Sequence, residues 1–168
     1  MRILALDISS SATGWAYGYD NKLIAYGKYI TKQSGERGKR LYEFSEWIER
    51  LVKEKNPELI IIERPFRGRN SNVLAILSKF VAVAEIAAYK VLKLEIQPDH
   101  FLDPRTIKKT LKVKRGNNHD QNKRLMVNKI NSIYGLKLKY NPKKSKTFND
   151  DDEADAIAIL HAWWKIHD

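Results

Sequence analysis

The chain has 168 residues, of which 43% are hydrophobic, and a formal net charge of +11. A chain of this length closes one compact core, so we expect a single domain over residues 1–168. It contains no cysteine, which excludes disulfides, thiolate metal sites and a cysteine nucleophile. There is no signal-peptide pattern and no uninterrupted apolar run of about 18 residues, so we expect a cytoplasmic protein with no membrane contact.

The chain begins with a predicted three-stranded meander. A tight turn at Asp20 and Asn21, of the kind that joins hairpins, separates the second and third strands. The first strand is apolar until it reaches Asp7 near its end. The three strands cover residues 2–8, 15–19 and 23–30.

A helix and a short buried strand follow the meander. Apolar residues recur at helical spacing between residues 38 and 56, and Pro57 stops that helix. Residues 59–62 are four consecutive apolar residues that lead to Glu63. A run that is apolar on both faces is typical of a central parallel strand.

The second part of the chain predicts helices around one more strand. Residues 73–92 form a helix that is apolar almost all round, and a fifth strand at 94–97 ends at Pro98. A basic stretch, 137–146, is expected to be mobile. Three further helices cover residues 104–111, 120–134 and 150–167. Together these elements predict an α/β fold in which a five-stranded mixed sheet carries helices on both faces.

The positive charge is concentrated in one region. Residues 105–146 contain 14 Lys and Arg against a single acid, Asp120, whereas the rest of the chain is close to neutral. A polyanion is the natural partner of such a region, because each phosphate that a cation neutralises releases counterions. The alternatives are a basic surface that serves solubility and a surface that binds an anionic membrane.

Two acids stand at the ends of apolar strands. The side chains of Asp7 and Glu63 would converge if their strands were neighbours, because ligands of open α/β sheets bind at the carboxyl ends of strands. Burying such carboxylates without compensation costs several kcal/mol, by rough estimate, so the pair favours a bound cation. Alternatively, each acid caps a turn or pairs with Arg64 or Arg67.

A third group of acids opens the last helix, in the run from Asp150 to Asp155. Helical spacing aligns Asp155 with either Asp151 or Asp152. Acids are favoured at helix N-termini, and Asp150 with Glu153 would form a capping box, so part of this run has a structural explanation. Asp155 lies beyond the first turn and interrupts an apolar series, and a divalent ion shared with the two strand acids would account for it.

Oxygen donors without cysteine or paired histidines indicate magnesium or manganese rather than zinc. Two such ions about 4 Å apart can activate water and stabilise a departing 3'-oxygen during phosphodiester hydrolysis. The expected products carry a 5'-phosphate and a 3'-hydroxyl.

The order of these acids resembles that of the RuvC-type Holliday junction resolvases, a family with the RNase H-like fold, along essentially the whole chain. The matching stretches are Leu6-Asp7 with Thr13-Gly14, Ile60-Ile61-Ile62-Glu63 with Phe66, and Asp152-Glu153-Ala154-Asp155-Ala156. The resemblance implies a metal-dependent endonuclease that uses two Mg²⁺ ions, for which Mn²⁺ can substitute, to cut Holliday junctions and other branched DNA. It also implies that the metal-site acids are Asp7, Glu63, Asp152 and Asp155, with Asp152 chosen over Asp151.

Further residues take their expected roles from the same resemblance. Phe66 matches an aromatic residue that stacks on bases at the branch point, although an ordinary core phenylalanine is the alternative. Lys108 matches a catalytic lysine that contacts the scissile phosphate, and Lys123 is a looser match to a second family lysine. The basic residues expected to contact DNA are Arg64, Arg67, Arg69, Arg105, Lys109, Lys112, Lys114, Arg115, Lys123, Lys143, Lys144 and Lys146.

The resemblance also implies a homodimer that nicks two opposed strands, with the apolar helix 73–92 as the dimer face. A crowded core is the alternative use of that helix. Ile8-Ser9 stands where many bacterial members have Pro-Gly, which indicates a divergent, phage-like member that acts in the cytoplasm of a bacterium or a phage-infected cell.

Other functions use a similar arrangement. A related RNase H-like nuclease would act on RNA:DNA hybrids, flaps or forks with the same acids, and a non-catalytic protein would bind branched DNA without cutting it. Sugar kinases and actin-like ATPases also begin with a strand, an acid and a Ser/Thr-Gly turn, but they need two such domains, for which this chain is too short.

Overall fold

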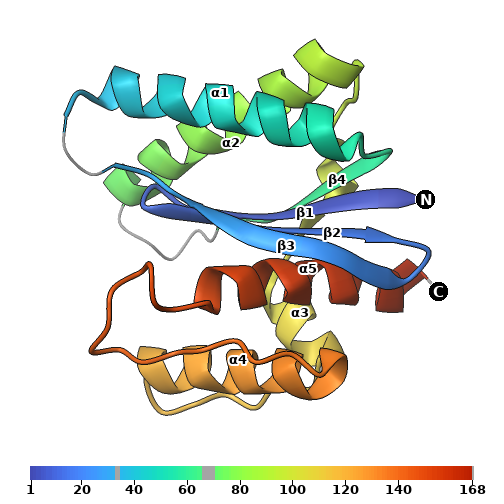
Figure 1. The fold of residues 1–168 in the computed structure, drawn as a ribbon, viewed down its shortest axis with the longest axis vertical. Helices are drawn as coiled ribbons and strands as arrows, with labels where there is room; N and C mark the ends of the chain where they lie inside the picture. The colour runs from blue at the N-terminus through green and yellow to red at the C-terminus, as the bar shows by residue number, and fades with distance from the viewer. Residues whose placement is uncertain (33–34, 66–70, 168) are drawn as a thin grey trace.

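The computed structural model describes residues 1–32, 35–65 and 71–167 and contains one five-stranded sheet. The strand order is β3-β2-β1-β4-β5, in which β1 pairs antiparallel with β2 and parallel with β4 (Figure 1). This arrangement confirms the expected mixed α/β sheet. The strands are β1 (Arg2–Ile8), β2 (Ala12–Tyr19), β3 (Lys22–Ile30), β4 (Leu59–Glu63) and β5 (Phe101–Leu102).

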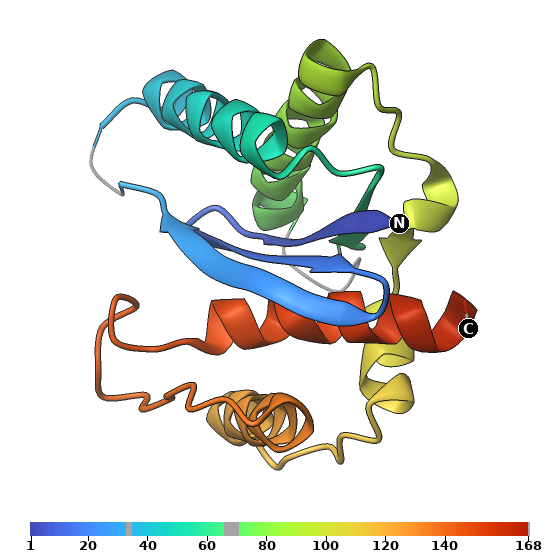
Figure 2. The ribbon, with the colours of Figure 1, turned by 45° about the vertical axis from the view of Figure 1, so that its right-hand side comes forward.

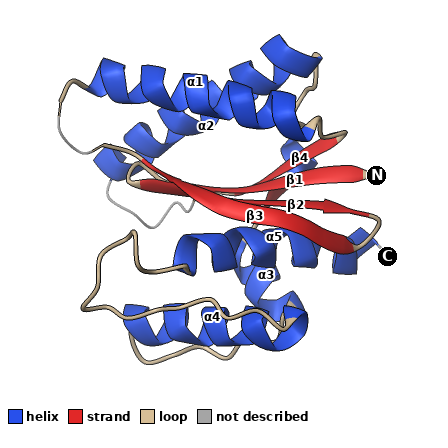
Figure 3. Ribbon diagram, viewed as in Figure 1, coloured by secondary structure: helices blue, strands red, loops and turns tan. Residues whose placement is uncertain are grey.

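Helices cover both faces of the sheet, as Figures 2 and 3 show. One face carries α1 (Arg37–Lys55) and α2 (Ser71–Leu92), which pack against each other. The other face carries α5 (Asp151–His167), and α3 (Pro104–Thr110) and α4 (His119–Tyr134) pack against α5. The last helix is therefore enclosed between the sheet and two other helices.

The alternation of side chains along β1 supplies both cores. Ile3 and Ala5 belong to the buried cluster under α5, whereas Leu4 and Leu6 belong to the cluster under α1 and α2. Because both faces are covered, β1 is apolar from Ile3 to Leu6. Asp7 lies on the same side as Ala5 and so faces α5.

Local sequence signals account for several ends of elements. Asp20 and Asn21 both have positive φ angles, +46° and +59°, as a two-residue hairpin turn between right-twisted strands requires. The helix α1 ends at Asn56 in the left-handed conformation, where its N–H donates to the carbonyl oxygen of Val52.

The position of the fifth strand differs from our prediction. Residues 93–97 form no strand, and β5 consists of Phe101 and Leu102, which pair in parallel with the end of β4. The alternation that suggested a strand is instead explained by Leu94 and Ile96, which pack against the core under α1 and α2.

The basic stretch before the last helix is not free, contrary to our expectation of mobility. Lys139 and Asp150 pair across its base, where the Asp150 N–H donates to the Lys139 carbonyl at 2.8 Å and the Lys139 N–H donates to the Asp150 carboxylate at 2.8 Å. The Asn141 N–H also donates to the Asn149 side chain at 2.7 Å. These bonds hold the segment as an ordered loop, which we call the α4–α5 loop (139–150).

The helix α2 is long and apolar enough to cross a membrane by length and composition, with a mean hydropathy of 1.6 over its most apolar window. About a quarter of that window, 28%, is buried inside the structure. Phe80, Val81 and Ala84 are among the residues that pack it into the core. Its outer face is largely unpaired within the described parts of this chain.

Candidate active site

The two strand-end acids lie side by side. Leu6 of β1 is in register with Ile62 of β4, and the two strands are parallel. Asp7 and Glu63 are the next residues along each strand, so they lie beside each other. Each is an odd-numbered residue like Ala5 and Ile61, whose side chains pack in the cluster under α5. Both carboxylates therefore point toward the start of α5 and are partly exposed.

A glycine allows α5 to approach these acids closely. Gly14 of β2 lies opposite Asp7 in the antiparallel pair, and a Cβ atom at Gly14 would overlap the backbone carbonyl of Asp152. The first turn of α5 therefore rests directly on the sheet beside Asp7. This contact places Asp152 and Asp155, which share a helical face, over the strand ends.

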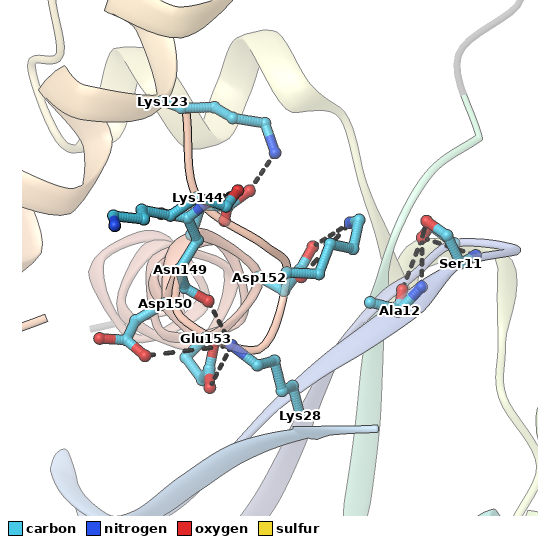
Figure 4. Close-up of polar contacts among 12 residues, drawn as sticks. Ser11, Ala12, Lys28, Lys123, Lys144, Asn149, Asp150, Asp152 and Glu153 are labelled. Carbon is cyan, nitrogen blue, oxygen red and sulfur yellow. Dashed lines mark hydrogen bonds and ion pairs between the residues drawn. The ribbon is translucent and has the colours of Figure 1, made fainter. Parts of the chain in front are cut away.

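A buried lysine fixes the start of α5 from the neighbouring strand (Figure 4). Lys28 of β3 donates to the carbonyl oxygen of Asn149 and to the Glu153 carboxylate, and its Nζ atom lies 3.9 Å from Asp150 Oδ1. The Lys28 side chain is 10% exposed. Ion pairs this well shielded are stronger than surface pairs, so the first turn of α5 is held in position.

All four predicted acids line one cleft of about 340 Å³. The cleft also contains two lysines, Lys123 and Lys146, together with His119 and the turn from Ser9 to Ser11. The acids that line the cleft are Asp7, Glu63, Asp152 and Asp155, so Asp152 faces it and Asp151 does not.

The neighbouring Asp151 is turned to a different partner. Its carboxylate accepts a hydrogen bond from Lys123, and the side chain is 6% exposed. Asp152 instead lies with Oδ1 at 3.4 Å from Lys146 Nζ (Figure 4). Asp152 therefore faces the cleft, and Asp151 anchors a lysine at its wall.

The acids strongly influence each other's protonation. Burial raises the pKa of Asp7 well above its ordinary value, and the charges of Asp155, Glu63 and Asp152 raise it further, against the opposing effect of Lys123. Burial also raises the pKa of Asp155 to about 8, with Glu63 as the next largest cause. The site thus concentrates more negative charge than its surroundings neutralise.

This donor set fits a hard divalent cation. Within residues 1–32, 35–65 and 71–167 no three acidic or histidine side chains are close enough together to form a ready-made cage. The acids surround the cleft from three elements, with ammonium groups as their nearest cations. Carboxylate oxygens that converge from these elements on one cleft match the coordination that Mg²⁺ and Mn²⁺ prefer.

A basic side cavity continues from the acidic cleft. Lys108, Arg105 and Arg115 line a hollow of about 590 Å³ that also reaches Glu63. A smaller hollow of about 180 Å³ joins Lys108 to Asp155. The predicted catalytic lysine therefore lies next to the acids, although they come from different elements.

The remaining predicted DNA-contacting residues divide into three groups. Arg64 lines the acidic cleft, while its guanidinium donates to the carbonyl oxygens of Pro98 and Phe101 and so braces β5. Phe66, Arg67 and Arg69 lie outside the described residues. The exposed lysines away from the cavities are Lys109 at the end of α3, Lys112 and Lys114 after it, and Lys143 and Lys144 in the α4–α5 loop.

Sequence reasoning missed two residues that the fold brings to the site. His119, which had no metal-ligand spacing to single it out, lines both the acidic cleft and the smaller hollow beside Lys108. Lys28 lies in a strand without other acidic or basic motifs, and its role depends on a helix that is more than 120 residues away in sequence. Neither position carries a local signal.

The α/β sheet carries acids at adjacent strand ends, a second pair of acids on the helix laid over them, and a basic rim. These features define a metal-dependent nuclease of the RNase H-like fold. The family model for the crossover junction endodeoxyribonuclease RuvC matches residues 3–161. The chain therefore belongs to the RuvC family, as its sequence motifs indicated.

Relatives and solved structures agree with this assignment. The RuvC protein of Corynebacterium diphtheriae is 28% identical over 140 residues, which cover 83% of this chain and 77% of the relative. The RuvC protein of Syntrophomonas wolfei is 27% identical, with 97% and 90% covered. The structure of Thermus thermophilus RuvC with a Holliday junction substrate has the same fold, with a TM-score of 0.75 at 16% identity, over 99% of this chain and 94% of that one.

Proposed function

We propose that this protein resolves Holliday junctions and related branched DNA by hydrolysing phosphodiester bonds in the cleft between β1, β4 and α5. The observation that carries the proposal is the meeting of Asp7, Glu63, Asp152 and Asp155 in one cleft bordered by lysines. The RuvC relatives named above support branched DNA as the substrate.

The four acids are proposed to hold two Mg²⁺ ions, for which Mn²⁺ can substitute. Such ions, when bound, supply Lewis-acid activation of water and neutralise charge at the scissile phosphate. The chain's own contribution is to fix the acids: β1 and β4 present Asp7 and Glu63, and Gly14 admits the helix turn that carries Asp152. We expect 5'-phosphate and 3'-hydroxyl products.

The basic residues beside the acids are proposed to hold the DNA backbone. Lys108 lies next to Glu63 and Asp155 through the two side hollows, where its ammonium group would contact the scissile phosphate. Lys123 is fixed by Asp151 at the cleft wall. Arg105 and Arg115 extend the positive surface from there, so a strand that enters the cleft meets cations along its path.

We further propose that the protein acts as a homodimer through the outer face of α2. Ile86 and Tyr89 are 64% and 52% exposed, and their helical spacing places them on one side of α2. They form an apolar stripe that the described residues of this chain leave exposed. Lys79, Glu85 and Lys90 interrupt the apolar surface of the helix, and Lys90 pairs with Glu49 of α1 at 2.9 Å. A mixed apolar and charged face suits a second protein surface better than lipid.

The test is a cleavage assay on synthetic four-way junctions, forks, flaps and RNA:DNA hybrids with and without Mg²⁺. We expect paired nicks in opposed junction strands, no cleavage in EDTA, and loss of cleavage in Glu63→Gln. The matched control, Glu54→Gln, changes an exposed acid at the end of α1 and should cut like the wild type. Cleavage restricted to the RNA of hybrids would contradict the proposal.

Lys108 has a separate test. Lys108→Ala is expected to slow cleavage of a bound junction at least tenfold while it weakens junction binding much less, because the lysine contacts the reacting phosphate. Lys109→Ala, which changes an adjacent exposed lysine, is the control. Equal losses of binding and cleavage in Lys108→Ala would show that Lys108 is only a phosphate anchor.

A further inference from the structure

An exposed aromatic side chain stands among the lysines of the α4–α5 loop. Every residue from 142 to 148 is exposed, and Phe148 is the large apolar side chain among them, with 42% of its surface open. The Lys139 ammonium group lies over its ring, 5.8 Å from the ring centroid, in a cation–π contact. A phenylalanine in this setting contributes nothing to the two buried core clusters.

The backbone that presents Phe148 is firmly held. The Phe148 N–H donates to the Ser145 carbonyl at 3.1 Å. The next residue, Asn149, is buried and makes four hydrogen bonds. Its N–H donates to the Ser145 carbonyl at 3.2 Å, its side chain accepts from the Asn141 N–H and donates to the Lys144 carbonyl at 3.2 Å, and its own carbonyl accepts from Lys28. An aromatic ring on such a support loses little conformational freedom when it is covered.

The loop also lies at the edge of the acidic cleft. Lys146, two residues before Phe148, lines that cleft, and its Nζ atom lies 3.4 Å from Asp152 Oδ1. Residues 139–148 contain four lysines and no acid: Lys139, Lys143, Lys144 and Lys146. A nucleic-acid strand that leaves the cleft along this side would meet positive charge and one exposed ring together.

We propose that Phe148 is a stacking platform for a DNA base that is unpaired or opened at the branch point. An aromatic ring surrounded by lysines is the combination that binds single-stranded nucleic acid, because the ring takes the base while the ammonium groups neutralise the flanking phosphates. Lys139 stands over the ring, and 42% of the Phe148 surface is still open to solvent, where a base could stack. This inference rests on the proposed function, and it is independent of Phe66.

Binding in EDTA tests the platform without cleavage. We expect Phe148→Ala to bind a four-way junction about 10-fold more weakly, which corresponds to loss of one stacked base, and to bind fully paired duplex within about twofold of the wild type. Phe148→Trp should restore junction binding and Phe148→Leu should not. A 2-aminopurine base placed at the branch point should be quenched by the wild type and less so by Phe148→Ala.

Salt separates stacking from charge. The loss in Phe148→Ala should persist as the salt concentration rises, whereas the loss in the control Lys144→Ala should shrink. Unchanged junction binding in Phe148→Ala, or an equal loss on duplex, would overturn the platform. If the wild type prefers and cuts junctions and Phe148→Ala binds them equally well, only the platform is overturned. If the wild type itself shows no preference for junctions, the proposed function is overturned too.

Discussion

Asp151 and Asp152 are neighbours in sequence but have different surroundings. Asp151 is buried against Lys123. Burial lowers the pKa of Lys123, but the hydrogen bond and the charge of Asp151 raise it, and the net effect is a rise. Asp152 is also mostly buried, yet it lines the cleft with Asp7 and Asp155. One helical step of about 100° separates the two side chains, so one faces α4 while the other faces the strand ends.

The two aspartates should therefore fail in different ways. We expect Asp152→Asn to raise the Mg²⁺ concentration needed for half-maximal cleavage by at least tenfold, because a ligand is lost. Asp151→Asn should leave that concentration nearly unchanged and lower the maximal rate instead, because Lys123 loses its anchor. Mg²⁺ titrations of junction cleavage measure both quantities, and identical titrations for the two variants would contradict this division.

The acids of the cleft should also make stability depend on pH. The folded pKa of Asp155 is about 8, well above its ordinary value of 3.8, so between these values the folded chain binds a proton that the unfolded chain releases. Stability without metal should therefore fall as pH rises from about 4 to about 8. Melting temperatures in EDTA test this, and Asp155→Asn should flatten the profile.

Added Mg²⁺ gives the matching control for this prediction. A cation bound to the deprotonated acids stabilises the folded state, so the melting temperature at pH 8 should rise with Mg²⁺ more than at pH 5. A melting temperature in EDTA that increases between pH 4 and pH 8 would show that other groups dominate the protonation balance.

At the scale of elements, the position of α5 decides whether the acids meet. Its first turn rests on Gly14 of β2, and Lys28 of β3 binds the residues around its start. Both contacts come from the meander that begins the chain, and neither Gly14 nor Lys28 itself lines the cleft. The meander therefore supports the site from the sheet side of α5, opposite α3 and α4.

A methyl group at Gly14 should disturb this support. Gly14→Ala places a Cβ where the Asp152 carbonyl lies, so we expect a destabilisation of about 1–3 kcal/mol, typical of overpacking, and a weaker response to Mg²⁺. The matched control is Gly38→Ala in α1, where a Cβ meets nothing within 4 Å and should stabilise the helix by up to about 1 kcal/mol. Denaturant unfolding of both variants measures the difference.

At the scale of the whole molecule, the two faces of the sheet have separate tasks. The face under α5, α3 and α4 carries the acids and most of the basic region, whereas the face under α1 and α2 ends in an apolar helix surface. The proposed nucleic-acid contacts and the proposed dimer contact therefore occupy different sides of the sheet. A two-fold dimer through α2 would leave both clefts open.

An acid on the outer face of α2 tests the dimer. Ile86→Glu should convert the protein to a monomer, because it places a charge in the middle of the apolar stripe. Ile133→Glu changes an exposed isoleucine of α4, on the other side of the sheet, and should leave the mass in solution unchanged. Analytical ultracentrifugation decides, and a wild type that sediments as a monomer would contradict the dimer itself.

Patterns within short segments were enough to predict most elements. Strand alternation, the Asp20-Asn21 turn and the end of α1 before Pro57 depend on neighbouring residues, and they are observed as predicted. The family motifs depend on residue order and were confirmed by the family match. The prediction of the fifth strand at residues 94–97 was wrong, because Leu94 and Ile96 pack into the core at alternate positions but their backbone does not pair with the sheet.

The amino-acid sequence by itself determined which acids and lysines are present, where the helices and the first four strands form, and that the positive charge gathers in one region. The tertiary structure alone decided that His119 and Lys28 belong to the surroundings of the cleft and that the loop carrying Phe148 is anchored. It also gives the physical reason why Asp152, which the resemblance chose over Asp151, faces the cleft. The reason is physical: these relations join residues that are distant in sequence. They depend on how closely the helix α5 packs against the sheet, which a local sequence pattern does not predict.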